Sequence, residues 1–277
     1  MGVDRSRGAA VLFLFSAWGC ASGGTSAEPS TAPDAQKLLC PELTGNADPL
    51  EAVFVDAPGP NARLRTFVAS ARGLNDVTLE IERRAVDTCR GIAHDLGAAE
   101  IPRTASLTAQ CAPLRDAIAS LTKENIELRV AIAPPKCKVD DARKARCDAI
   151  AANANAADSG DLCTAQGTVY SRCSLPAVSF ALSKHTEQAL KLGKSLESNL
   201  PALLYADLAL GRRLVDHVSK VVAVSVKLGA ELKDVGPHGL ACVALATTAV
   251  TKSSERLKRF LDLSSEIVLS LDPEMTP

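Results

Sequence analysis

Residues 61–97, with the sequence NARLRTFVASARGLNDVTLEIERRAVDTCRGIAHDLG, carry the hydrophobic pattern that decides the fold of this chain. Apolar side chains recur there at intervals of three and four residues, which places them on one face of an α-helix. Asn61 is a suitable cap for the start of this helix, and Gly97 stands where a C-terminal glycine is expected. Gly73 predicts that the helical segment is split near Asn75.

A second helix is predicted to begin after Pro102, with Thr104 or Ser106 as its cap, and to continue through Ile132. It is expected to stop at the Pro134-Pro135 pair, because proline lacks a backbone N–H and restricts the residue before it. The connection between the two helices is short, which favours antiparallel neighbours.

Nine cysteines are spread along the chain, and one of them, Cys20, belongs to the N-terminal segment considered below. The other eight are Cys40, Cys89, Cys111, Cys137, Cys147, Cys163, Cys173 and Cys242. An even number in an exported chain implies a disulfide framework, here of four bridges. A zinc site would need closely spaced ligands such as C-x2-C, and the sequence has no such pair.

The first bridge is predicted from the spacing of Cys89 and Cys111. Each lies eleven residues from Glu100, at the centre of the short connection between the two predicted helices. Equal offsets from the turn bring residues of an antiparallel hairpin side by side. We therefore expect Cys89 to pair with Cys111.

Two connectivities fit the four cysteines between residues 136 and 178. Local pairing would join Cys137 to Cys147 and Cys163 to Cys173, whereas nested pairing would join Cys137 to Cys173 and Cys147 to Cys163. Residues 141–157 favour a helix, which would hold the first two cysteines roughly 15 Å apart. A disulfide needs Cα atoms within about 7 Å, so nested pairing is preferred.

Elimination leaves Cys40 to pair with Cys242. This bridge would tie a proline-rich N-terminal loop to the last helix, which is predicted from about Gly239 to Leu271.

The segment between the cysteine-rich region and the last helix is predicted to contain a short strand and two helices. Residues 178–182 alternate between apolar and polar positions, which indicates a strand. Residues 183–198 favour a helix, and Pro201 then marks the start of a long helix that runs to about Asp234. Its broad apolar surface predicts a position in the middle of a bundle, with only one edge in water.

These elements predict a mainly α fold, an antiparallel helical bundle of long helices with a small disulfide-rich insert. The predicted parts are a signal peptide (1–19), a flexible tether (20–35), an N-terminal helical segment (36–133), a cysteine-containing insert (134–178) and a C-terminal helical segment (179–277) that packs with residues 61–133.

The first nineteen residues have the pattern of a secretory signal. Arg5 and Arg7 give a basic start, and an apolar run follows from Ala9 to Ala17. This run is far shorter than the roughly 20 apolar residues that a helix needs to cross a bilayer. The segment therefore predicts export rather than a membrane span.

The sequence Ala17-Trp18-Gly19-Cys20 resembles the lipobox of bacterial lipoproteins. In that family the cysteine is lipidated and becomes the first residue of the mature chain. Ala21 takes the place of the Asp that retains members of that family at the inner membrane, which favours the outer membrane, facing the periplasm or the cell surface. The alternative is an ordinary secretory signal, with Cys20 as a spare thiol.

Most of the mature chain resembles a group of myxobacterial lipoproteins of unknown function. The matching pieces are the lipobox, Thr88-Cys89-Arg90-Gly91-Ile92-Ala93-His94-Asp95-Leu96-Gly97, Asn199-Leu200-Pro201-Ala202-Leu203-Leu204 and Leu240-Ala241-Cys242-Val243-Ala244. The group has an N-terminal helical pair, a cysteine-rich middle and a helical C-terminal part. Its middle is often a longer array of hairpins than the segment from Cys137 to Cys173 found here. The resemblance implies a helical fold and brings no activity.

Composition narrows the possible functions. Lys and Arg number 31 and Asp and Glu 32, and no basic stripe is present, which argues against nucleic-acid binding. The membrane is therefore expected as a partner only through an N-terminal lipid, and protein partners stay open. Ser120-Leu121-Thr122-Lys123 matches the S-x-x-K motif of penicillin-binding enzymes, but the accompanying S-D-N and K-T-G motifs are absent and the match is read as chance. No other catalytic motif occurs, so we expect no catalytic residue, metal site or cofactor.

His217, on the long predicted helix, is interpreted as a satisfied core or boundary residue, with a pH-sensitive or ligand-contacting role as the alternative. The sequence thus favours a lipid-anchored envelope lipoprotein with a non-catalytic structural or interaction role. A periplasmic binding module that holds an apolar ligand or peptide between its helices is the second hypothesis.

Overall fold

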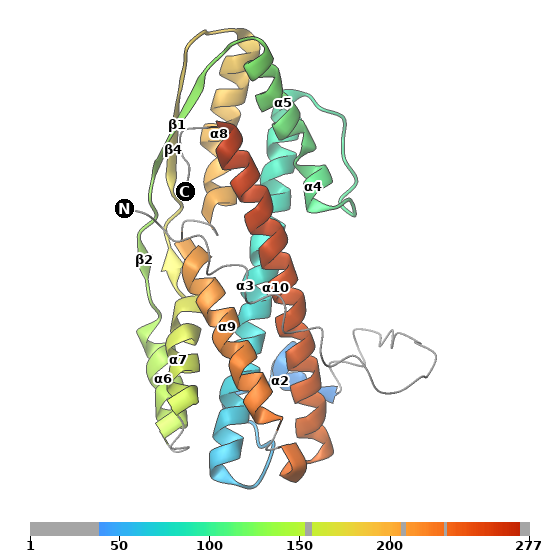
Figure 1. Cartoon of the computed structure of the whole chain (residues 1–277), viewed down its shortest axis with the longest axis vertical. Coiled ribbons are helices and arrows are strands. Elements are labelled where there is room, and N and C mark those ends of the chain that lie inside the picture. The colour runs from blue at the N-terminus through green and yellow to red at the C-terminus, as the bar shows by residue number, and fades with distance from the viewer. Residues whose placement is uncertain (1–38, 153–156, 206–208, 230–231, 272–277) are drawn as a thin grey trace.

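One uninterrupted helix, α3 (Pro58–Leu96), runs through the middle of the molecule (Figure 1). The predicted break at Gly73 is wrong, because this glycine serves close packing: a Cβ there would lie 2.6 Å from the hydroxyl of Tyr170. Asn61 lies inside the helix, where its side chain accepts a hydrogen bond from the backbone N–H of Phe54 at 2.8 Å. Gly97 follows the last turn with φ 74°, the left-handed conformation expected of a C-terminal glycine.

The computed structural model describes residues 39–152, 157–205, 209–229 and 232–271, and it confirms the mainly helical fold. The other helices are α2 (Pro41–Thr44), α4 (Leu107–Gln110), α5 (Ala112–Lys123), α6 (Asp141–Ala152), α7 (Ala157–Val169), α8 (Glu187–Tyr205), α9 (Gly211–Leu228) and α10 (Pro237–Leu271), with a 3-10 turn at Leu232–Asp234. The strands are β1 (Leu128–Ala133), β2 (Cys137–Lys138), β3 (Arg172–Cys173) and β4 (Ala177–Leu182). Among the described helices, none combines the length and the apolar character that a membrane span requires.

The segment after α3 folds back along it before α4 begins. Arg90 on α3 donates a hydrogen bond from Nη1 to the carbonyl of Ile101 at 2.6 Å, and Cys89 is bonded to Cys111 at the end of α4. From there α5 runs in the same direction as α3 (Figure 1), so the expected antiparallel pair of helices is wrong. The predicted bridge is present, but the returning loop rather than a helical hairpin brings its two cysteines together.

The predicted second helix also ends earlier than expected. It stops at Lys123, Asn125 adopts the left-handed conformation with φ 52°, and the chain continues as β1. β1 pairs antiparallel with β4, with Leu128 opposite Leu182 and Val130 opposite Phe180. Alternate β1 residues are buried against the core, so a two-residue period takes over from the helical one.

The insert is a hairpin of α6 and α7 that two nested bridges close. Cys137 pairs with Cys173 across the short ladder of β2 and β3, and Cys147 pairs with Cys163 between the two helices. Local pairing is thereby excluded, because α6 carries the chain away from Cys137 before it reaches Cys147. The hairpin packs through α7 on α3 and α9.

The C-terminal part contains two helices where one long helix from Pro201 was expected. Pro201 lies inside α8, and a separate helix, α9, begins at Gly211. The chain is divided because the two helices have different partners: α8 packs on α3 and β4, whereas α9 packs on α7 and α3. The predicted position in the middle of the bundle is also wrong for this segment, since Val215 on α9 is exposed and α3 holds the centre.

The close contact between β4 and α8 yields a prediction about Gly193. A Cβ at this position would lie 2.3 Å from Cε2 of Phe180, so Gly193→Ala must displace the ring from its packing site. We expect a loss of about 1–2 kcal/mol in the free energy of unfolding, measured by urea denaturation.

Gly160→Ala in α7 is the matched control, because a Cβ there meets no atom within 4 Å. It should be neutral or stabilising by up to about 1 kcal/mol through helix propensity. Equal effects of the two substitutions would contradict the packing argument.

Candidate functional site

The predicted site residues lie in four separate places rather than one. Cys40–Cys242 ties α2 to α10, Cys89–Cys111 joins α3 to α4, and the nested pairs close the insert. Cys137 and Cys173 are half-buried, whereas the other six are fully buried. Cys20 lies outside the described residues. Three groups of polar side chains around this framework are the candidates for a functional site.

The first group, the sulfur cluster, consists of Cys40, Cys242, Glu42, His238 and Phe54. Glu42 Oε2 lies 3.6 Å from Sγ of Cys40, 3.5 Å from Sγ of Cys242 and 3.2 Å from Nε2 of His238. His238 Nε2 is also 3.7 Å from Sγ of Cys242, and its ring stacks on Phe54 with centroids 5.7 Å apart. A carboxylate, an imidazole and two sulfur atoms therefore meet at one point.

Local structure explains how the sulfur cluster is assembled. α2 begins directly after Cys40, so its first turn carries Glu42 back toward the bridge. His238 and Cys242 are four residues apart on α10 and share one helix face. Glu42 and His238 were not predicted from the sequence. The i, i+4 spacing of His238 and Cys242 was a signal for the histidine, whereas Glu42 joins the cluster only through the fold.

The second group, the tyrosine cleft, lies between the insert, α3 and the segment before α3. It has a volume of about 280 Å³ and is lined by Asn46, Ala47, Asp48, Pro49, Leu50, Ala69, Arg72, Asp76, Arg143, Arg146, Gln166 and Tyr170. The guanidinium of Arg143 lies over the ring of Tyr170, 3.5 Å from its centroid. Oε1 of Gln166 is buried there without a hydrogen-bond partner in the described part of the chain.

Charge in the tyrosine cleft is unevenly compensated. Arg146 forms ion pairs with Asp48 at 2.9 Å and with Glu51 at 2.6 Å. Partial burial raises the pKa of Asp76, although the positive charges of Arg72 and Arg143 oppose this change. Burial likewise raises the pKa of the Tyr170 hydroxyl.

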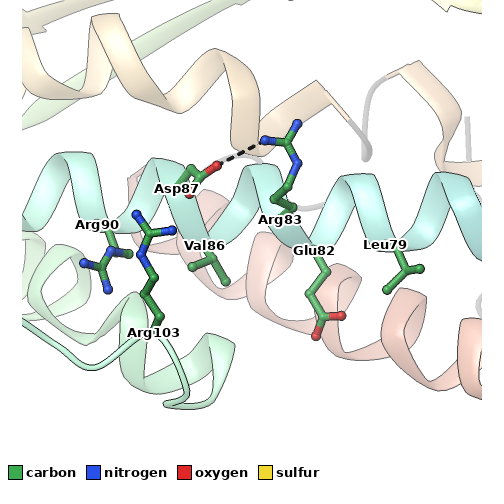
Figure 2. Close-up of a pocket in the computed structure, with 7 residues that line it drawn as sticks. All are labelled: Leu79, Glu82, Arg83, Val86, Asp87, Arg90 and Arg103. Atoms are coloured by element: carbon green, nitrogen blue, oxygen red, sulfur yellow. Dashed lines mark ion pairs between the residues drawn. The ribbon is translucent and has the colours of Figure 1, made fainter. Parts of the chain in front are cut away.

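The third group, the arginine groove, is a surface hollow of about 290 Å³ along α3 (Figure 2). Its lining residues are Leu79, Glu82, Arg83, Val86, Asp87, Arg90 and Arg103. In Figure 2 Arg83 points toward Asp87, with which it forms an ion pair at 3.6 Å. Because Arg90 is also held by Glu100 at 3.3 Å, most of the positive charge here is already paired within the protein.

His217 is fully buried between α9, α3 and α7, which agrees with the expected core position but not with the expected full hydrogen bonding. Its Nε2 lies 3.5 Å from the carbonyl oxygen of Ser70, and its Nδ1 has no hydrogen-bond partner among the described residues. Burial lowers its pKa to about 4, and the nearby charge of Lys220 acts in the same direction. The imidazole is therefore neutral at physiological pH and belongs to the core.

Comparison of the chain with family models, with curated proteins and with solved structures found no match. The interpretation of the three groups therefore rests on their geometry alone.

His217 should make the stability of the fold depend on pH. Its pKa falls from 6.5 in the unfolded chain to about 4 in the folded protein, so the unfolded state binds the extra proton between these values. Stability is therefore lost as the pH drops through this window, by about 3 kcal/mol once the pH is below 4. Urea denaturation at pH 7 and pH 4.5 should show that His217→Gln loses less stability than the unmodified protein.

His94→Gln is the control for this experiment, because the His94 side chain is 92% exposed. It should keep the pH dependence of the unmodified protein. If His217→Gln behaves like this control, the buried imidazole is not the source of the effect.

Proposed function

We propose that this chain is an exported lipoprotein, anchored at the outer membrane through a lipid on Cys20, with a non-catalytic structural or interaction role. The observation that carries the proposal is the set of four disulfides in a helical bundle. Such a framework indicates an oxidising, extracytoplasmic compartment. The secretory pattern of residues 1–19 and its lipobox-like ending supply the route and the anchor.

One feature of the described surface supports an interaction role. Val215 and Val226 on α9 are 43% and 69% exposed, and their spacing of eleven residues places them on one outward face of the helix. These exposed valines offer apolar contact area to a partner.

Replacement of the lipid-bearing residue tests the anchor. Cys20→Ser should move the protein from the membrane fraction to the soluble periplasmic or extracellular fraction, because no sulfur remains to carry the lipid. Fractionation, together with metabolic labelling by a radioactive fatty acid, measures both effects. Ser22→Ala is the control and should leave labelling and membrane association unchanged. Continued tight membrane association of Cys20→Ser would count against the proposal.

A binding module is the second candidate function, and the tyrosine cleft is the observation that favours it. Within the described ranges, no carboxylate lies at ion-pair distance from Arg143, whose guanidinium rests on Tyr170. A ligand of this cleft would be small and anionic, since it would meet the guanidinium of Arg143. The cleft therefore favours a polar ligand over the apolar one expected from the sequence.

Ligand binding in the tyrosine cleft should depend on Arg143. In a thermal-shift screen of small carboxylates and phosphates, any compound that stabilises the protein through this cleft should lose its effect in Arg143→Ala. Arg129→Ala is the control, because this arginine lies on β1 with a largely exposed side chain. Equal shifts in both variants, or no shift with any compound, would remove this candidate.

A further inference from the structure

The position of Glu42 is not explained by the disulfide that it faces. Its side chain is only 10% exposed, and the sulfur atoms of Cys40 and Cys242 lie within 3.6 Å of its Oε2. A disulfide carries no proton, so neither sulfur can donate a hydrogen bond to the carboxylate. Burial of a carboxylate is costly unless charge and hydrogen bonds compensate it, and His238 is the only donor seen at this oxygen among the described residues.

Cysteine, histidine and glutamate, the residue types that meet at this point, are the ones that bind zinc in proteins. Zinc is held by cysteine sulfur at about 2.3 Å and by histidine nitrogen or carboxylate oxygen at about 2.0–2.2 Å, which sets neighbouring ligand atoms of a tetrahedral site about 3.3–3.8 Å apart. In the sulfur cluster the two sulfur-to-oxygen distances are 3.6 and 3.5 Å, the oxygen-to-nitrogen distance is 3.2 Å, and His238 Nε2 lies 3.7 Å from Sγ of Cys242. The two sulfur atoms are 2.02 Å apart in the bridge and would have to separate on reduction to reach the spacing of two metal ligands. Cys40, Glu42 and Cys242 are buried and offer their ligand atoms within 4.8 Å of one another.

We propose that the sulfur cluster is a redox-gated site for a zinc-type divalent cation, which Cys40, Cys242, Glu42 and His238 bind when the bridge between the two cysteines is reduced. The two thiolates select a borderline-soft metal over calcium or magnesium. Glu42 then faces a cation rather than sulfur lone pairs, which accounts for a buried carboxylate at this point. The proposal is independent of the lipid anchor.

The chemistry balances in two steps. A dithiol reductant transfers two electrons and two protons to the Cys40–Cys242 bond, which becomes two thiols while the reductant becomes a disulfide. Binding of one divalent cation then releases the two thiol protons and forms two metal–sulfur bonds. Reoxidation of the thiolates by a disulfide of the same class restores the bridge and releases the cation.

The metal would preserve the tie that the bridge provides. Cys40 precedes α2 and Cys242 lies on α10, so either the covalent bond or the cation joins the same two parts of the fold. A cation that binds the folded form stabilises it by mass action. Reduction in the presence of metal should therefore leave α2 attached to α10.

Cobalt(II) is the probe, because tetrahedral thiolate coordination gives it intense and characteristic absorption. The full chain is reduced with a phosphine under anaerobic conditions, separated from the reductant and titrated with cobalt(II). Cys40→Ser/Cys242→Ser supplies the baseline from all the other cysteines of the chain. The unmodified protein should bind one more cobalt ion than this double variant, with the spectrum of a two-sulfur tetrahedral site, and zinc should displace it.

Glu42→Gln and His238→Gln keep every thiol and test the two ligands that make the site specific. Each should weaken cobalt binding at least about tenfold, since loss of a supporting residue alone typically costs 10–100-fold. Glu124 lies at the end of α5 and His94 on an exposed turn of α3. Glu124→Gln and His94→Gln are therefore the matched controls and should bind cobalt as the unmodified protein does.

The proposal fails if the double cysteine variant binds as much cobalt as the unmodified protein. It also fails if Glu42→Gln and His238→Gln match their controls, which is the outcome expected when the reduced chain unfolds and its thiols bind metal without a built site. Circular dichroism of the reduced protein, with and without cobalt, should show the helical signal retained with the metal. Loss of that signal in both samples would overturn the proposal as well.

Discussion

The packing of α2 and of each helix from α4 to α10 on α3 is the constraint on which the described structure depends. This helix contacts α2 and each helix from α4 to α10, and its 39 residues span about 58 Å. A helix in water gains most of its stability from tertiary packing, so α3 and its partners hold one another in place. α3 also carries Arg72 and Asp76, which line the tyrosine cleft, and Arg90, which lines the arginine groove. Its Ser70 carbonyl faces the buried His217.

The four disulfides hold different segments of the chain against α3. Cys89–Cys111 fixes the returning loop to α3, and the nested pairs keep the insert closed so that α7 can pack as a unit. Cys40–Cys242 joins residues 202 positions apart and constrains the unfolded chain most, by up to about 5 kcal/mol in a loop-entropy model. The bundle therefore has covalent links at both ends and in its insert.

Local periodicity predicted the helical class, α10, and the helical character of α3 but not its continuity through Gly73, because the long apolar patterns agree with the packing. Periodicity failed where packing against other elements determines the local structure. Pro201 stays helical because α8 packs against α3 and β4. Residues 128–132 form a strand because they pair with β4. The nested bridges were accessible through helix geometry. The sulfur cluster was not, because Glu42 and His238 are 196 residues apart and only the fold brings them together.

The Cys40–Cys242 bridge also decides how mechanical load enters the molecule. α2 has only four residues, so without the bridge a pull on the chain ahead of residue 40 would detach this single turn from the bundle. With the bridge in place, tension passes through sulfur directly into α10, the helix with the broadest contact to α3. A force applied through an attachment on the N-terminal side would then move the bundle as one body, without first unfolding α2.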